Sequence, residues 1–246
     1  MSAAPRSRRL LGTLAVLGPG LVAANAGNDA GGIATYASAG AEYAYRTLSF
    51  MVLVTVALVI VQELAARLGA YTGEGLVSLI REQFPLRVAA FAVACLVVAN
   101  LGLVVSEFAG IGAALELVGV PRLLSIPVAA VVIWALVAVG SYRVAERMFL
   151  LLSLAFLAYV ASAFLGRPDW HAVAVQTVVP HWIASSRFLF LGVAMIGTTI
   201  TPYMQLYQAA AVADKGIGPS EYGAARADAV FGSIAANAVS CCIIVA

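Results

Sequence analysis

The stretch NAGNDAGGIATYASAG, residues 25–40, places an aspartate, Asp29, inside an apolar run that extends from Leu10 to Ala41. A carboxylate at the centre of a lipid bilayer costs at least about 2.5–3.5 kcal/mol to insert. Gly31 and Gly32 follow it almost at once, and each glycine weakens a helix interior by about 1 kcal/mol relative to alanine. The stretch therefore predicts a membrane helix that is interrupted at a buried carboxylate.

The composition of the chain supports a membrane setting. Of 246 residues, 63% are hydrophobic and only 11% are charged, and the mean hydropathy is +0.98. Soluble domains carry about 25% charged residues. The net charge of +2 is too small to favour nucleic-acid binding, and the three cysteines lack the spacing of metal ligands. We expect an all-α integral membrane protein with the lipid bilayer, and no nucleic acid, as its partner.

A membrane-spanning helix needs about 20 apolar residues, and the sequence predicts seven spans. They cover 10–41, 47–66, 87–116, 123–140, 145–165, 186–213 and 222–246. With the N-terminus in the cytoplasm, ten of the fourteen Lys and Arg residues fall inside and four outside, as the positive-inside rule requires. We expect a multi-pass protein of the plasma (inner) membrane with a cytoplasmic N-terminus and an external loop at 166–185.

The sixth span is also interrupted. Its sequence GTTITPYMQLYQ, residues 197–208, contains Pro202, which removes a backbone donor and clashes one turn back. Lipid cannot satisfy the freed carbonyl groups, so such a break is tolerated where it lies in protein or lines a wet cavity. Two interrupted spans separated by four intact ones are typical of an inverted-repeat transporter. A pair of structural kinks, common in membrane helices, is the alternative.

The two breaks together favour a cation. The first half of each broken helix ends with unpaired carbonyls and the negative end of its dipole. No lysine or arginine lies near the middle of either span to neutralise Asp29. A bound cation is the simplest partner, and a carboxyl group kept protonated by desolvation is the alternative.

Five stretches, in this order, resemble the Nramp family of divalent-metal transporters. They are GPGLVAANAGNDAGGIAT (18–35), QELAARLGAYTGEGL (62–76), YRVAERMF (142–149), RPDWHAV (167–173) and GTTITPYMQLYQ (197–208). The resemblance implies a LeuT-like inverted-repeat transporter fold with unwound helices 1 and 6, and a transporter rather than an enzyme. It implies one transmembrane domain over 1–246, with the first repeat at about 10–165 and the start of the second at about 186–246. On this reading the chain is truncated after helix 7.

The resemblance also implies a metal site. Asp29 matches the metal-binding aspartate of the family signature Asp-Pro-Gly-Asn, and Ala30 stands where that signature has proline. The carbonyls of Ala26 and Thr198 map onto the backbone ligands, and Thr201 stands at the position of the signature methionine. The remaining candidates for the cavity or a proton route are Asn28, Gly32, Glu107, Tyr203 and Gln205.

The departures from the family pattern bear on the choice of ion. A methionine thioether favours soft transition metals, whereas the hydroxyl of Thr201 is a hard donor. Gly32 replaces the signature asparagine and widens the site. A wider, all-oxygen site suits Mg²⁺, which retains several of its waters, and the sequence resembles the Nramp-related magnesium transporter branch. Asn28 could bond to the carboxylate or cap the helix, and Gln205 could face the cavity.

The expected function is uptake of Mg²⁺ and/or Mn²⁺ by alternating access. We expect a monomer with no resident cofactor, the divalent cation being cargo. Tyr203 replaces a histidine that can titrate near neutral pH, which favours transport without proton coupling and leaves Glu107 as the candidate proton carrier. The alternative function is a secondary symporter of a small cationic organic solute on the same fold.

Overall fold

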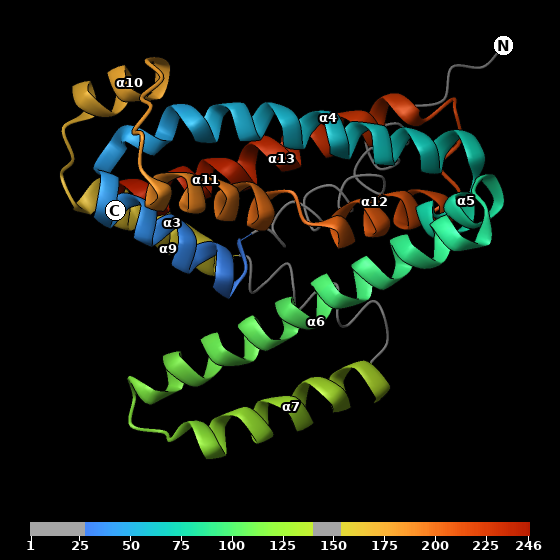
Figure 1. Cartoon of the computed structure of the whole chain (residues 1–246), viewed down its shortest axis with the longest axis horizontal. Coiled ribbons are helices and arrows are strands. Elements are labelled where there is room, and N and C mark those ends of the chain that lie inside the picture. The colour runs from blue at the N-terminus through green and yellow to red at the C-terminus, as the bar shows by residue number, and fades with distance from the viewer. Residues whose placement is uncertain (1–27, 140–153) are drawn as a thin grey trace, which may run out of the picture.

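The structure is a computed structural model that describes residues 28–139 and 154–246. The described residues form helices and no strands (Figure 1). The α-helices are α3 (Ala30–Tyr43), α4 (Leu48–Thr72), α5 (Leu76–Gln83), α6 (Leu86–Glu116), α7 (Arg122–Val139), α9 (Leu157–Leu165), α10 (Trp170–Val178), α11 (Ser186–Thr199), α12 (Pro202–Asp214) and α13 (Tyr222–Val245). Two short 3₁₀ turns, η2 (Ala44–Thr47) and η3 (Leu154–Phe156), precede α4 and α9.

Each predicted span corresponds to helix in the described part of the chain. Four helical stretches there are long and apolar enough to cross a membrane, namely Ala30–Thr72, Leu86–Glu116, Ser186–Asp214 and Tyr222–Val245. The first holds two helices, because the backbone turns at η2, where Ala44 has φ of 49°. For the predicted spans at 10–41 and 145–165, only the second part lies among the described residues.

The helices differ from the prediction at three places, one of which is α5, a helix that lies between two predicted spans. Helix α4 continues beyond the predicted end at residue 66 to Thr72, where Gly73 terminates it with φ of 71°. The predicted external loop at 166–185 contains α10, which begins at a side-chain cap. The Asp169 carboxylate accepts hydrogen bonds from the backbone N–H groups of His171 and Ala172. At nine residues α10 is too short to span a bilayer.

Helices α4 and α13 form the centre of the molecule and lie side by side (Figure 1). One apolar cluster joins them to α3 and α11; it consists of Tyr36, Ala39, Leu48, Met51, Leu191, Met195, Ile243 and Ile244. A second cluster joins them to α12 and the following loop; it consists of Ala66, Ala70, Val212, Ile217, Ala225 and Ala229. These contacts fix α3 and α11 beside one another on the same support.

Close approach of the backbones maintains this packing. A Cβ atom built at Gly69 of α4 would overlap the carbonyl oxygen of Ala209 in α12. A Cβ atom at Gly40 of α3 would likewise overlap the carbonyl oxygen of Ile244 in α13. Small residues at such crossings let membrane helices pack tightly, so both half-helices that flank the breaks are held against the α4–α13 centre.

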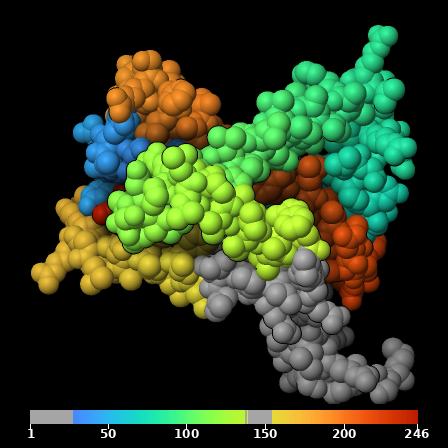
Figure 2. All heavy atoms as spheres, turned by 90° about the horizontal axis from the view of Figure 1, so that it is seen from below, coloured from blue at the N-terminus to red at the C-terminus, as the bar shows by residue number. Residues whose placement is uncertain are grey.

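Helices α6 and α7 form an antiparallel pair that extends away from this centre (Figure 1) and lies across one face of the molecule (Figure 2). Their large apolar side chains are mostly exposed, for example Phe91, Val105 and Trp134. In a bilayer such side chains are suited to contact with lipid or with other helices. Helix α6 contacts the start of α3, which brings α6 to the candidate site.

Candidate metal centre

The break in the sixth span lies between α11 and α12. Ile200 and Thr201 leave the helical conformation, with ψ of 67° and 139° respectively, and α12 restarts at Pro202. In a continuous helix the carbonyl of Thr198 would accept from the N–H of residue 202. Proline has no N–H, so Pro202 leaves the Thr198 carbonyl without its helical donor.

The described part of the first span begins at Asn28, one residue before Asp29. Asp29 has an extended backbone, with φ of −69° and ψ of 174°, and caps α3 by accepting the N–H of Gly32 on its Oδ1 at 2.5 Å. Its carboxylate therefore lies at the positive end of the α3 dipole. The Ala26 carbonyl expected to be a ligand lies outside the described residues.

The start of α3 lies against the break between α11 and α12. The hydroxyl of Thr198 in α11 donates to Asp29 Oδ1 at 3.4 Å, across 169 residues of sequence. Between them lies a cavity of about 230 Å³, lined by Asp29, Gly31, Thr35, Ala99, Asn100, Leu103, Gly197, Thr198, Thr201, Pro202 and Tyr203. The structure thus brings together four of the residues named from the sequence: Asp29, Thr198, Thr201 and Tyr203.

Two side-chain oxygens of residues that line this cavity have no hydrogen-bond partner among the described residues. They are Asp29 Oδ2 and Thr201 Oγ1, and both are buried. Buried polar atoms are almost always paired, and an unpaired buried charge is costly. Together with the Thr198 carbonyl they form a set of hard oxygen donors that could bind a cation. No group of three His, Cys, Asp or Glu side chains suited to a metal occurs in the described ranges.

The side chain of Asn28 and the backbone N–H of Gly32 make hydrogen bonds that hold the start of α3 in place. The Asn28 amide donates to the carbonyl of Ala236 at 3.2 Å and accepts from the Ser240 hydroxyl at 2.8 Å, so it anchors the break to α13. It neither bonds to the Asp29 carboxylate nor caps α3. Gly32 is buried and supplies the capping N–H.

Glu107 and Gln205 also lie off the cavity lining. Glu107 of α6 accepts the backbone N–H of Ala30 on Oε1 at 3.1 Å. Gln205 is buried in α12, and its Nε2 has no partner within the described chain. Neither reaches the cation position through a contact that the structure shows.

Sequence reasoning missed two polar residues that line the cavity, Thr35 and Asn100. Thr35 is one turn beyond Gly31 on α3, so helical periodicity could have placed it on the same face. Asn100 lies on α6, and its position on the cavity depends on how α6 crosses α3. No pattern in the sequence of either helix indicates that crossing.

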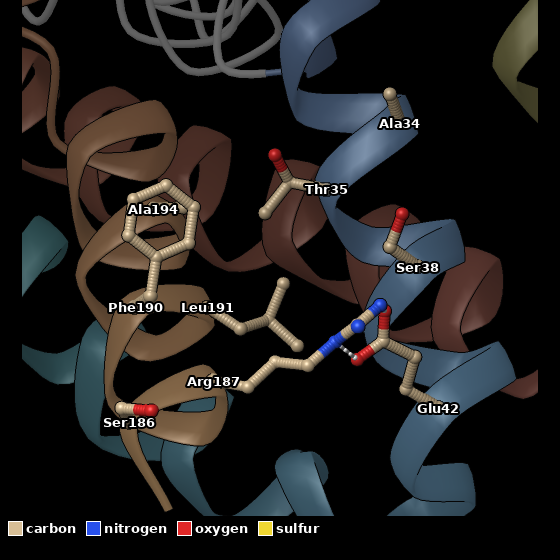
Figure 3. Close-up of a pocket in the computed structure, with 9 residues that line it drawn as sticks. All are labelled: Ala34, Thr35, Ser38, Glu42, Ser186, Arg187, Phe190, Leu191 and Ala194. Carbon is tan, nitrogen blue, oxygen red and sulfur yellow. Dashed lines mark hydrogen bonds and ion pairs between the residues drawn. The ribbon is translucent and has the colours of Figure 1, made fainter.

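A second, larger pocket of about 710 Å³ lies between α3 and α11 (Figure 3). Thr35 lines both this pocket and the Asp29 cavity. At its outer end Arg187 of α11 and Glu42 of α3 form a two-fold ion pair, with N–O distances of 2.5 and 2.7 Å. The two pockets therefore adjoin at Thr35.

Comparison with known proteins agrees with this arrangement. The model of a family described as natural resistance-associated macrophage protein-like, or Nramp, matches residues 20–246. Among curated proteins, the divalent metal cation transporter MntH of Ralstonia nicotianae is 35% identical over 197 residues, 76% of this chain and 43% of its own length. MntH of Bacillus subtilis is 30% identical over 203 residues, 80% of this chain and 47% of its own. The chain thus spans about half the length of the curated relatives it matches.

Solved structures show the same fold. The manganese transporter of Eremococcus coleocola, in complex with an aromatic bis-isothiourea substituted compound, superposes with a TM-score of 0.80 at 22% sequence identity. The match covers 99% of this chain and 52% of that one. The expected LeuT-like, multi-pass helical fold is confirmed by this likeness, and the family match over nearly the whole sequence shows that the chain belongs to the Nramp family.

Proposed function

We propose that this chain carries the binding site of a protein that moves divalent metal cations across a membrane by alternating access, and that it is a transporter rather than an enzyme. One observation carries the proposal. Asp29 Oδ2 and Thr201 Oγ1 are both buried and unpartnered among the described residues, and Asp29 and Thr201 are both lining residues of one cavity between the start of α3 and the break that separates α11 from α12. A partly hydrated cation would satisfy both oxygens.

The proposed ligands are Asp29, the Thr198 carbonyl and the Thr201 hydroxyl, with the Ala26 carbonyl as a further ligand from the sequence. Asp29 supplies the charge, and the other groups supply neutral oxygens. Mn²⁺ is supported by the names of the relatives, which are divalent metal and manganese transporters. Mg²⁺ is supported by the hard, sulfur-free donor set, because soft thioether ligands are what favour transition metals over it.

Several finer points belong to the same proposal. We place the protein in the plasma membrane as a monomer with a cytoplasmic N-terminus, binding no nucleic acid. The metal is cargo, and no resident cofactor is proposed. Helix motion would come from rocking of the broken helices against the rest of the bundle.

The test is metal binding by the purified full-length protein, titrated calorimetrically with Mn²⁺ and Mg²⁺. Asp29→Asn keeps an oxygen that can cap α3 but removes the charge, and we expect it to abolish binding of both ions. The matched control is Asp169→Asn, which makes the same change at the cap of α10, far from the cavity. Wild-type affinity in the Asp29→Asn protein would refute the site. A small organic cation that binds in place of both metals would instead support the symporter.

A further inference from the structure

The start of α3 rests on one face of α6. Glu107 accepts the N–H of Ala30 at 3.1 Å, and the methyl group of Ala30 lies so close to Gly110 that any side chain there would overlap it. A Cβ atom on Gly31 would come within 3.0 Å of Ser106 Oγ. Ser106, Glu107 and Gly110 therefore hold the first two residues of α3, which directly follow Asp29.

The hydrogen bond to Glu107 comes from an amide that has no partner within its own helix. The first N–H groups of a helix lack internal acceptors, and Ala30 is the first residue of α3. Asp29 Oδ1 satisfies Gly32, while Glu107 satisfies Ala30. The two carboxylates thus share one helix terminus and bind different amides of it.

Resting on the function proposed above, we propose that Glu107 is a positioning residue for the metal site. By holding the Ala30 amide it fixes the start of α3, and so the position of the Asp29 carboxylate beside the cavity that Asp29 lines, without itself contacting the cation. Its absence from the cavity lining supports this role. What matters at position 107 is then an acceptor oxygen, and a negative charge or a titrating proton is not required.

Three substitutions distinguish the effect of the Glu107 acceptor oxygen from the effect of its negative charge. Glu107→Gln keeps a carbonyl oxygen and removes the charge, whereas Glu107→Ala removes both. Ala30→Pro removes the donor and leaves Glu107 intact. The backbone tolerates proline there, because proline is favoured at the first position of a helix and Asp29 before it is already extended.

The measurement is Mn²⁺ affinity of the full-length protein by calorimetry, over a range of pH. We expect Glu107→Gln to bind within about twofold of wild type with an unchanged pH profile. Glu107→Ala and Ala30→Pro should each weaken binding by about tenfold or more, because each loses one hydrogen bond to a charged group. The double variant Glu107→Ala with Ala30→Pro should be no weaker than either single one, because both changes remove the same bond.

A different pattern would overturn the proposal. If Glu107→Gln binds as weakly as Glu107→Ala while Ala30→Pro binds normally, Glu107 acts through its charge. Multiplied losses in the double variant would contradict a shared bond. Glu116→Gln, on an exposed residue of the same helix, is the matched control and should bind normally. Loss of binding in Asp29→Asn alone would leave the proposed function standing whatever Glu107 does, since that variant tests the metal site directly.

Discussion

Asp29 uses its two oxygens differently. Oδ1 accepts the α3 capping N–H and the Thr198 hydroxyl, whereas Oδ2 is buried without a partner among the described residues. The α3 terminus carries about half a positive charge, which stabilises an ionised carboxylate without a lysine or arginine beside it. One oxygen therefore holds the aspartate in place, and the other remains available to a cation.

Thr201→Met is the residue-scale test of ion preference. The change replaces an unpartnered hard hydroxyl with a soft thioether at the same cavity wall, so we expect the Mn²⁺ to Mg²⁺ affinity ratio to rise by about tenfold. Calorimetric titration of both ions gives the ratio. The control is Thr177→Met, where the hydroxyl already bonds to the Val173 carbonyl outside the cavity. An unchanged ratio would remove Thr201 from the ligand set.

The sequence could predict the residues that mark the breaks but not what lies across from them. Asp29 and Pro202 each interrupt the helix in which they lie. The nearby residues Thr198 and Thr201 could therefore be predicted as site residues from the local sequence. The contact of Glu107 with Ala30 depends on how α6 crosses α3, and no pattern within either segment encodes that crossing. The same limit explains why Asn28 was linked to the carboxylate although its amide bonds to α13.

At the element scale, the break between α11 and α12 supplies the Thr198 carbonyl. Pro202→Ala restores an N–H that can bond to this carbonyl and lets the helix continue through 200–201. We therefore expect Mn²⁺ affinity to fall by about tenfold, the cost of one strong ligand contact, measured by calorimetry. Pro127→Ala, at the proline inside α7, is the matched control. Equal affinity in the Pro202→Ala and wild-type proteins would mean that the carbonyl is not a ligand.

The ion pair between α3 and α11 belongs to the same scale (Figure 3). An exposed pair stabilises a protein by at most about 1 kcal/mol, so its main effect is on charge at the pocket mouth. Arg187→Gln leaves Glu42 without this cation, and we expect the KM for Mn²⁺ uptake into proteoliposomes to fall about twofold at low salt and to return at high salt. Arg122→Gln, which opens the exposed pair with Glu116, should leave KM unchanged. A KM insensitive to Arg187 at low salt would exclude the pocket as a route for the ion.

Hydropathy predicted the long elements well and the short ones poorly. The segments that form α4, α6, α7 and α13 are continuous apolar runs, and in a membrane such a run forms a spanning helix. Helices α5 and α10 have eight and nine residues, too few for an apolar run to distinguish helix from loop. The stretch from Pro168 to Trp170 did hold a local signal, since Asp169 is a preferred capping residue ahead of a helix.

At the scale of the whole molecule, the described helices alternate in direction (Figure 1). One end of the molecule carries helix α10, the C-terminal end of α3 and the start of α11. The other end carries α5 and the turn between α12 and α13. Arg81 lies in α5, Arg87 at the start of α6 and Lys215 just after α12, whereas Arg167 precedes α10. From these positions the positive-inside rule leads us to expect that the α5 end is the cytoplasmic one.

Thiol labelling of intact cells tests this orientation. In a full-length variant without its natural cysteines, Trp182→Cys lies near α10, where the native side chain is exposed, and Glu74→Cys lies near α5, where it is half-buried. Because a charged maleimide does not cross the bilayer, we expect it to label Cys substituted at Trp182 in whole cells and that at Glu74 only after permeabilisation. Both sites should react in detergent, which controls for accessibility. Labelling of Glu74→Cys but not Trp182→Cys in whole cells would invert the topology, and would place the Thr35 pocket on the cytoplasmic side.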